Sequence, residues 1–533
     1  MENKRQWWEE AVIYQIYPRS FKDSDGDGIG DLPGLISELD YIASLGVDAV
    51  WVNPVYLSPG LDNGYDISDF RRIDAQYGTM EDMLRLIDGL HNRGMKIIMD
   101  MVLNHTSDQH EWFIEARSSR TNPYYSFYHW WPAERGEPPH RCGFFDASGK
   151  GWEYNAATDS YYLHYFAPQQ PDLNWENPRV RSELYAMLRW WLDKGVDGVR
   201  LDAICFISKD TAWPEVGADV LLSEYHNDWG HYYAAGPRLH EYLKEMRSEV
   251  FSGYDVVVIG EMAGVGAEDA HLFVGELDIL YYFEGISIGY LPGAFKKVDP
   301  AGYRLDVWKE VYTRWEAALR DGVWGALYLG NHDQPRMVSR WGDDSAAAAK
   351  LLFTWLLTMR GTPFIYNGDE LGMTNIRFTA ISDYKDVETL RMYENLEKNG
   401  GDAGGFLKDQ KLTGRDNGRT PFQWNGENAA GFTCGTPWIA VNPNFRSVNR
   451  EAEEGDDGSV LNYVRELIRL RKSSPALTYG GYEVLGPEHP QVYAYRRWLG
   501  DEEWTIVLNF SDAEQEWLGH KLSPWEALVL PVI

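Results

Sequence analysis

Cysteine is scarce in this sequence of 533 residues, and no long uninterrupted apolar run occurs in it. The three cysteines, Cys142, Cys205 and Cys434, lie far apart, which argues against a disulfide framework or a zinc site built from closely spaced cysteines. No stretch reaches the roughly 18 apolar residues that a membrane-spanning helix needs. The first residues also lack the apolar segment of a secretion signal, so we expect a cytoplasmic protein.

Positive charge is also in short supply. Lys and Arg number 50 against 81 Asp and Glu, which gives a net charge of −31. Nucleic acids and anionic membranes need a basic surface, so neither is expected as a partner. Aromatic residues, by contrast, are abundant, with 23 Trp, 33 Tyr and 20 Phe. They indicate a large core, or stacking surfaces for a flat apolar ligand face such as that of a sugar ring.

Short apolar segments alternate with amphipathic helix patterns over the first two-thirds of the chain. We predict helices at 35–45, 80–93, 180–194 and 238–251. The strands that we predict lie at 12–17, 49–52, 96–102, 198–201, 256–259, 326–329 and 362–366. Strands that alternate with helices form parallel βα units. So many units fit an α/β fold, either a closed (β/α)₈ barrel or a doubly wound sheet.

Two segments interrupt this alternation. Residues 104–174 are rich in Tyr, Trp, His and Pro and lack a helical period, which is typical of a functional insertion. Beyond about residue 475 the pattern changes to short strands, predicted at 482–485, 492–495, 505–508 and 527–530. We therefore expect a small antiparallel β domain at the C-terminal end.

Polar side chains follow four of the predicted strands where each strand ends. One such strand end could simply be solvated, but the carboxyl ends of barrel strands meet on one face, where active sites lie. Four polar strand ends therefore predict a site. They are Asn104-His105, Arg200-Leu201-Asp202, Glu261 and Asn331-His332-Asp333.

Three carboxylates in these segments, Asp202, Glu261 and Asp333, show no obvious metal-ligand spacing and suggest glycoside chemistry. That chemistry needs one ionised carboxylate and one protonated acid. Arg200 lies two residues before Asp202, on the same side of the strand, and should lower the pKa of Asp202 as a nucleophile requires. Glu261 follows an apolar run, so its pKa should be raised, as a general acid requires.

The chain as a whole resembles glycoside hydrolase family 13, the α-amylase family, and within it the oligo-1,6-glucosidase and α-glucosidase group. The resemblance runs from Trp7 into the C-terminal domain and rests on ordered motifs. These are Asp100 to His105, Gly198 to Asp202, Gly260-Glu261-Met262, Asn331 to Arg336, Gln170-Pro171-Asp172-Leu173-Asn174, Trp7 to Phe21 and Arg415 to Trp424.

This resemblance implies a (β/α)₈ TIM barrel with an inserted subdomain after strand 3 and a C-terminal antiparallel β-sandwich. We expect the barrel at 1–103 and 175–474, the insertion at 104–174 and the β domain at 475–533. The implied activity is a retaining, exo-acting α-glucosidase without an organic cofactor. We expect a monomer or homodimer whose partner is a small oligosaccharide.

The resemblance also implies residue roles. Asp202 would be the nucleophile, Glu261 the general acid and base, and Asp333 a stabiliser of the distorted sugar, with a carboxyl separation of about 5–5.5 Å between the first two. Between Arg415 and Arg419, the former is favoured as the partner of Asp62. The implied substrate-binding residues are Asp62, Tyr65, His105, Gln170, Arg200, His332, Arg336 and Arg415.

An acidic loop follows the first strand. Its alternate carboxylates fit the first half of an EF-hand loop, but Gly34 stands where a Glu is required, so a true EF-hand is not expected. Mutual repulsion argues against a bare acidic turn, and the matching loop of the resembling subfamily binds calcium. We expect a structural Ca²⁺ site, with Mg²⁺ as the alternative. Its predicted ligands are Asp23, Asp25, Asp27, the Ile29 carbonyl and Asp31.

Linkage preference stays open because position 203, which follows the nucleophile, is Ala203. In the resembling group Val at this place accompanies α-1,6 preference and Thr accompanies α-1,4. We expect short α-1,6 oligosaccharides such as isomaltose, with α-1,4 linkages and sucrose as alternatives. A trehalose synthase-like transglucosidase is the nearest rival function. A sucrose isomerase fits less well because its charged isomerisation motif is absent, and a non-catalytic transporter subunit is disfavoured because all three carboxylates are present.

Overall fold

Eight parallel strands close into a barrel in the order β1-β13-β12-β11-β10-β9-β5-β2 in the computed structural model. The structure describes residues 5–141, 143–145, 150–217, 232–291, 296–299, 302–320 and 322–532. The closed sheet confirms the barrel and excludes the doubly wound alternative. Its strands are β1 (Ile13–Ile16), β2 (Ala49–Val52), β5 (Lys96–Val102), β9 (Gly198–Asp202), β10 (Val257–Met262), β11 (Ile279–Tyr282), β12 (Trp324–Leu327) and β13 (Thr362–Tyr366).

Alternate residues of each strand point into the barrel and out toward the helices. Ile13 packs in the cluster inside the barrel, while its neighbour Tyr14 packs in the outer cluster. Trp51 and Val50 divide in the same way on β2. Because both faces are covered, the strands are largely apolar, which explains why most of them were predictable as apolar runs.

The sixth barrel strand, β11, was missing from the sequence-based prediction. Only a 3₁₀ segment, Ala267–Phe273, separates β10 from the turn before β11, so no amphipathic helix marks this βα unit. The predicted helix at 35–45 was also wrong in detail. It is two short helices, α2 (Leu32–Ser37) and α3 (Leu39–Ser44), which meet at Glu38.

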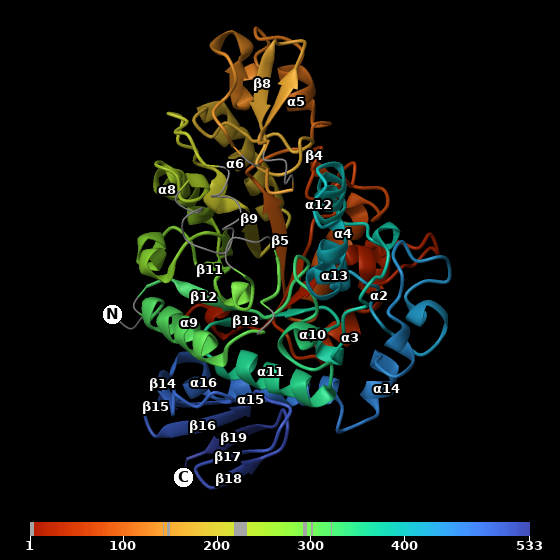
Figure 1. Cartoon of the computed structure of the whole chain (residues 1–533), viewed down its shortest axis with the longest axis vertical. Helices are drawn as coiled ribbons and strands as arrows, with labels where there is room; N and C mark the ends of the chain where they lie inside the picture. The colour runs from red at the N-terminus through yellow and green to blue at the C-terminus, as the bar shows by residue number, and fades with distance from the viewer. Residues whose placement is uncertain are drawn as a thin grey trace.

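Helices cover the outside of the barrel, and Figure 1 shows the inserted segment at one end of the molecule and the C-terminal sheets at the other. Among the described residues, none of the helices has both the length and the apolar character to cross a bilayer. The remaining helices are α1 (Trp7–Glu10), α4 (Met80–His91), α6 (Pro178–Leu192), α8 (Leu239–Glu249), α9 (Leu305–Ala318), α10 (Met337–Trp341), α11 (Ala346–Thr358), α12 (Val387–Lys398), α13 (Ala403–Thr413), α14 (Arg450–Glu454), α15 (Val460–Ser473) and α16 (Pro475–Tyr479).

The insertion after β5 carries its own small sheet. Its strands β6 (Trp130–Pro132), β8 (Ser160–Leu163) and β7 (Trp152–Asn155) lie side by side in that order, next to the short helix α5 (Glu111–Ala116). A two-stranded pair, β3 (Tyr56–Leu57) and β4 (Asp69–Ile73), follows β2. Cys142 lies outside the described residues.

The C-terminal region forms two antiparallel sheets. The first has the order β14-β15-β16-β19, and the second pairs β17 with β18. Val492 and Val507 from the first sheet share a buried cluster with Leu522 of the second, so the two sheets face each other. The bounds are β14 (Gly481–Leu485), β15 (Val492–Leu499), β16 (Glu502–Asn509), β17 (Gln515–Trp517), β18 (His520–Leu522) and β19 (Ala527–Pro531). The domain boundaries given above remain predictions.

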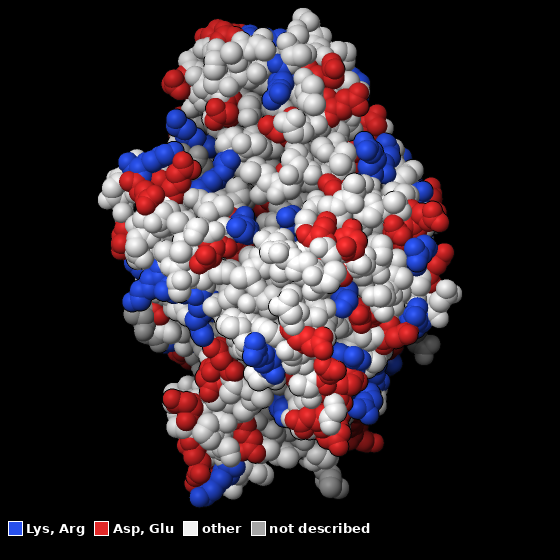
Figure 2. Space-filling view, turned by 90° about the vertical axis from the view of Figure 1, so that its right-hand side faces the viewer, with Lys and Arg blue, Asp and Glu red and all other residues white. Residues whose placement is uncertain are grey.

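Basic and acidic side chains are interspersed over the face drawn in Figure 2, and the basic ones do not form a continuous patch on it. Many acidic groups on the surface are paired, as in the ion pair of Arg496 with Glu483 at 2.6 Å. Exposed pairs of this kind contribute little to stability but keep the surface hydrated.

Candidate active site

A pocket opens at the carboxyl ends of the barrel strands and contains the three predicted catalytic carboxylates. Asp202 ends β9, Glu261 lies near the end of β10, and Asp333 follows β12. The lining combines these acids with aromatic and charged side chains from many loops. It comprises Asp62, Tyr65, His105, Phe144, Phe145, Phe166, Asp202, Phe206, Glu261, Ala263, Gly264, Phe283, Lys296, His332, Asp333, Gln334, Glu388 and Arg415.

Arg200 links the carboxylates at the floor of the pocket. Strand register sets Asp100 beside Arg200, and Arg200 beside Ile259, so side chains from β5, β9 and β10 converge. The Arg200 guanidinium is fully buried and contacts Asp202 and Glu261, as well as Asp100 at 2.9 Å. The backbone N–H of Ala203 donates to the second oxygen of Glu261 at 2.7 Å. One cation therefore contacts both of the carboxylates predicted to react.

The expectation of a lowered pKa for Asp202 was wrong. Burial raises the pKa of Asp202 well above its ordinary value, the Glu261 charge adds to the rise, and Arg200 opposes it. Burial also raises the pKa of Glu261, as predicted. Since one guanidinium cannot compensate two buried carboxylates and Asp100 as well, we infer that Asp202 and Glu261 titrate as a pair that retains one proton. One ionised and one protonated carboxyl is the state that glycoside cleavage requires.

Asp333 is held in the ionised form by its neighbours. Burial acts to raise its pKa, but His332 and the guanidinium groups of Arg415 and Arg419 hold the pKa of Asp333 well below its usual range. Arg415 Nη1 lies 2.9 Å and Arg419 Nη2 3.1 Å from Asp333 Oδ1. A permanently charged carboxylate suits hydrogen bonding to sugar hydroxyls and excludes a role as proton donor.

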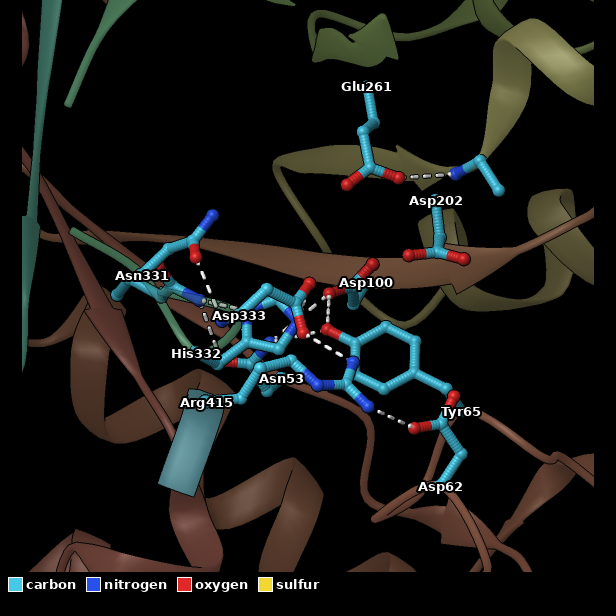
Figure 3. A network of polar contacts seen from close by, with 12 residues as sticks. Asn53, Asp62, Tyr65, Asp100, Asp202, Glu261, Asn331, His332, Asp333 and Arg415 are labelled. Atoms are coloured by element: carbon cyan, nitrogen blue, oxygen red, sulfur yellow. Dashed lines mark hydrogen bonds and ion pairs between the residues drawn. The ribbon is translucent and has the colours of Figure 1, made fainter. Parts of the chain in front are cut away.

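The wall opposite Asp202 and Glu261 is built around Asp62 (Figure 3). Arg415 Nη2 lies 3.3 Å from Asp62 Oδ1, whereas Arg419 Nε donates to the His332 carbonyl. This places Arg415 against Asp62, as predicted. Gln170 Nε2 donates to Asp62 Oδ2 at 3.0 Å and contacts His105 Nε2 at 3.2 Å.

Ionisation in this wall follows from burial. Burial raises the pKa of Asp62 to about 7, although Arg415 opposes the shift. Burial lowers the pKa of both His105 and His332 to about 3, so both rings are neutral at neutral pH. Tyr65 stacks on His332 with ring centroids 5.0 Å apart and an angle of 5° between the planes.

Arg336 lies elsewhere. Its Nη1 donates to the Asn367 carbonyl at 2.7 Å and pairs with Asp369 at 3.1 Å, and its guanidinium lies over the Tyr366 ring. The side chain is buried outside the pocket lining. The prediction that Arg336 contacts substrate therefore has no support in the geometry, and we read it as a support for the loop after β13. Gln170 is likewise not part of the pocket lining and donates to Asp62, which is part of it.

Several lining residues escaped the sequence analysis. Lys296 and Glu388 pair at 2.8 Å, and Glu388 lies 2.9 Å from Arg415 Nε, but neither belongs to a motif. Five phenylalanines form the apolar wall; three of them come from the insertion, whose aromatic content was the signal, and two come from outside it. They are Phe144, Phe145, Phe166, Phe206 and Phe283.

The acidic loop after β1 brings together three of its predicted ligands. One carboxylate oxygen from each of Asp23, Asp25 and Asp27 lies within 4.8 Å of the others. Asp31 is used differently, because its Oδ1 accepts from the Gly34 N–H at 2.6 Å and caps α2. The donor set suits a hard cation such as Ca²⁺.

A family model described as "Alpha amylase, catalytic domain" matches residues 15–480. The chain therefore belongs to the α-amylase family of glycoside hydrolases, as the motifs indicated, and is an enzyme of that class.

Particular relatives are similar over nearly the whole chain. An oligo-1,6-glucosidase of Parageobacillus thermoglucosidasius is 48% identical, over 96% of this chain and 91% of its own. A trehalose-6-phosphate hydrolase of Escherichia coli (strain K12) is 42% identical, over 98% of this chain and 94% of its own. The solved structure of an isomaltulose synthase from Klebsiella sp. LX3 superimposes with a TM-score of 0.94 at 42% identity, covering 99% of this chain and all of that one.

Proposed function

We propose that this protein is a retaining, exo-acting α-glucosidase that hydrolyses short α-glucosides from the non-reducing end. The observation that carries the proposal is the pair of Asp202 and Glu261 on one guanidinium, in a pocket walled by the Asp62–Arg415 ion pair. The reacting carboxylates activate the bond, and the charged wall would hold the hydroxyls of the terminal sugar and stop longer chains from passing through.

The chemistry follows from the two carboxylates. Glu261 donates its proton to the glycosidic oxygen while a carboxylate oxygen of Asp202 attacks the anomeric carbon, so the C–O bond to the leaving sugar breaks as the bond to Asp202 forms. The resulting β-glucosyl ester is cleaved by water, whose proton returns to Glu261. Two inversions release α-glucose. Asp333, His105 and His332 line the pocket and would hydrogen-bond the sugar during both steps.

An α-1,6 preference is the proposal that the similarity to oligo-1,6-glucosidases supports best. Ala203 bears on it, because this residue is buried in the left-handed region at φ 49° and lies directly after the nucleophile. A β-branched residue there would be strained as well as larger. We infer that alanine, which is smaller than Val or Thr, leaves more room beside the nucleophile for the leaving sugar.

A panel of isomaltose, panose, maltose, trehalose and sucrose tests this assignment, with products identified by chromatography. We expect glucose from isomaltose and panose with kcat/KM at least about tenfold above maltose, the scale set by one or two weak contacts. Ala203→Thr should lower that ratio, and Ala203→Val is its matched control of similar size. Preferential cleavage of maltose by the wild type would contradict the α-1,6 proposal.

The transglucosidase alternative is separated by the same panel. The similarity to an isomaltulose synthase keeps an isomerase within the range of related activities. Such an enzyme would convert sucrose or maltose into an isomeric disaccharide with little free glucose. Release of glucose and fructose from sucrose, or no reaction, agrees with the hydrolase.

For the acidic loop we propose a structural Ca²⁺ held by Asp23, Asp25, Asp27 and the Ile29 carbonyl, with Asp31 fixing the loop to α2. Removal of calcium with EDTA should then lower the melting temperature, since a ligand at about 100 times its Kd contributes about 2.7 kcal/mol. Calcium should restore it. Asp25→Asn should abolish the response, whereas Asp457→Asn, an exposed acid elsewhere, should keep it. An unchanged melting temperature after verified metal removal would contradict the site.

A further inference from the structure

A chain of buried polar side chains runs beneath the pocket from Arg200 to His332. Its members are Arg200, Asp100, Asn53, Gln15 and His332, each at most 1% exposed. Gln15 lies on β1 beside Trp51 in the strand register, so it belongs to the layer that faces the barrel interior. All five side chains are buried, so bulk water does not reorient them. Each of their polar groups therefore has to find its hydrogen-bond partner among neighbouring protein groups.

Asp100 determines which group donates and which accepts in this series of hydrogen bonds. Arg200 Nη1 lies 2.9 Å from Asp100 Oδ1, and the Trp51 indole N–H lies 3.3 Å from Asp100 Oδ2. Both groups can only donate, so Asp100 accepts. Asn53 Nδ2 lies 3.3 Å from Asp100 Oδ2, which sets the nitrogen of the Asn53 amide toward Asp100 and leaves Asn53 Oδ1 as an acceptor on the other side.

Asn53 in turn orients Gln15. Gln15 Nε2 lies 2.9 Å from Asn53 Oδ1, and turning the Gln15 amide over would place two carbonyl oxygens against each other. The same nitrogen lies 2.9 Å from His332 Nδ1. Within the part of the chain that the structure describes, Gln15 Oε1 has no hydrogen-bond partner, so this side chain acts only as a donor.

We propose that Gln15 is a positioning residue that fixes His332 as the tautomer with its proton on Nε2. His332 Nδ1 accepts the second N–H of Gln15, so the ring proton resides on Nε2. That atom lies 3.2 Å from Asp333 Oδ2 in the pocket lining, and Tyr65 stacks on the ring and holds its plane (Figure 3). We call the series of hydrogen bonds from Arg200 to His332 the relay. It keeps an N–H donor on the pocket side of His332.

The kinetic consequence rests on the proposed function, because a donor at His332 Nε2 helps only if a sugar hydroxyl or Asp333 receives it during catalysis. Gln15→Glu should reverse the hydrogen bond between residue 15 and His332, because a carboxylate accepts a hydrogen bond from Nδ1–H. A neutral ring would then turn the Nε2 lone pair toward Asp333. A doubly protonated ring would keep the Nε2 proton, so the variant should lose activity progressively as the pH rises through the raised His332 pKa.

The ring nitrogens can be read directly by NMR on the full chain labelled with ¹⁵N-histidine, with His332 assigned by its disappearance in His332→Asn. In the wild type we expect protonated Nε2 and unprotonated Nδ1 between about pH 5 and 8. Gln15→Glu should protonate Nδ1. It should also lower kcat about 100-fold at the alkaline end of this pH range, which is the effect expected when one preorganised hydrogen-bond donor is lost. Gln15→Met should give a mixture of both tautomers.

Gln423→Glu is the matched control. Gln423 is fully buried and donates to the Val448 carbonyl outside the relay, so this variant measures the cost of a buried carboxylate and should leave the His332 nitrogens unchanged. A wild-type ring with its proton on Nδ1 would overturn the proposal, as would Gln15→Met with Nε2 protonated only. Neither readout needs substrate, so they stand apart from any failure of the proposed activity.

Discussion

Replacement of Asp202 by alanine should lower kcat on isomaltose by about 10⁴-fold or more, because no other side chain can form the covalent glucosyl intermediate. The melting temperature should not fall. Arg200 keeps Asp100 and Glu261 as partners, and burial beside Glu261 already disfavours the Asp202 charge. Steady-state kinetics together with thermal unfolding measure both effects.

Azide distinguishes a missing nucleophile from a damaged site. With an aryl α-glucoside as substrate, azide can enter the space that Asp202→Ala vacates and attack the anomeric carbon from the same side, which yields β-glucosyl azide. Glu261→Ala keeps Asp202, so azide should displace the ester and yield the α-azide. Near wild-type hydrolysis by Asp202→Ala, or the α-azide from that variant, would refute the assignment.

Loss of Lys209 should destabilise the protein by about 3–5 kcal/mol, the cost of leaving one member of a buried ion pair without its partner. Lys209 and Asp172 side chains are fully buried, with Nζ 2.8 Å from Asp172 Oδ2 and 2.6 Å from Asn104 Oδ1. The lysine thereby ties the segment after β9 to the insertion and to the end of β5. Urea unfolding of Lys209→Met, followed by tryptophan fluorescence, measures the loss.

A second substitution tests the cause of that loss. Asp172→Asn removes the charge but retains an oxygen that can accept from the Tyr165 N–H, at 3.1 Å in the structure. The double variant should therefore recover most of the stability that Lys209→Met loses. If both variants were equally unstable, the loss would come from packing of the lysine stem and not from an uncompensated carboxylate.

The strand segments were predictable because parallel barrel strands are buried on both faces and read as apolar runs. β11 was missed although its four residues are apolar and buried, since no α-helix marks its unit. The predicted catalytic carboxylates could be found because each lies at or shortly after the carboxyl end of such a strand. Lys296, Glu388 and Phe283 could not, because they come from loops that only the folded chain brings together.

The Arg336 prediction shows the limit of transfer by motif. Arg336 stands three residues after Asp333, within one motif, yet it turns toward Asp369 while Asp333 faces the pocket. Closeness in sequence therefore did not specify whether each side chain points into the pocket or away from it. The pKa of Asp202 shows the same limit, since burial and the charge of Glu261 together outweigh the adjacent guanidinium.

The sequence by itself determined the residue types for the chemistry, the alternation of strands and helices, and the position of each carboxylate at a strand end. These properties depend on neighbours along the chain. Tertiary structure decided that the sheet closes, that one arginine serves two carboxylates, and which nitrogen of His332 faces the pocket. Those properties depend on partners such as Gln15 and His332, which lie 317 residues apart and meet only inside the closed barrel.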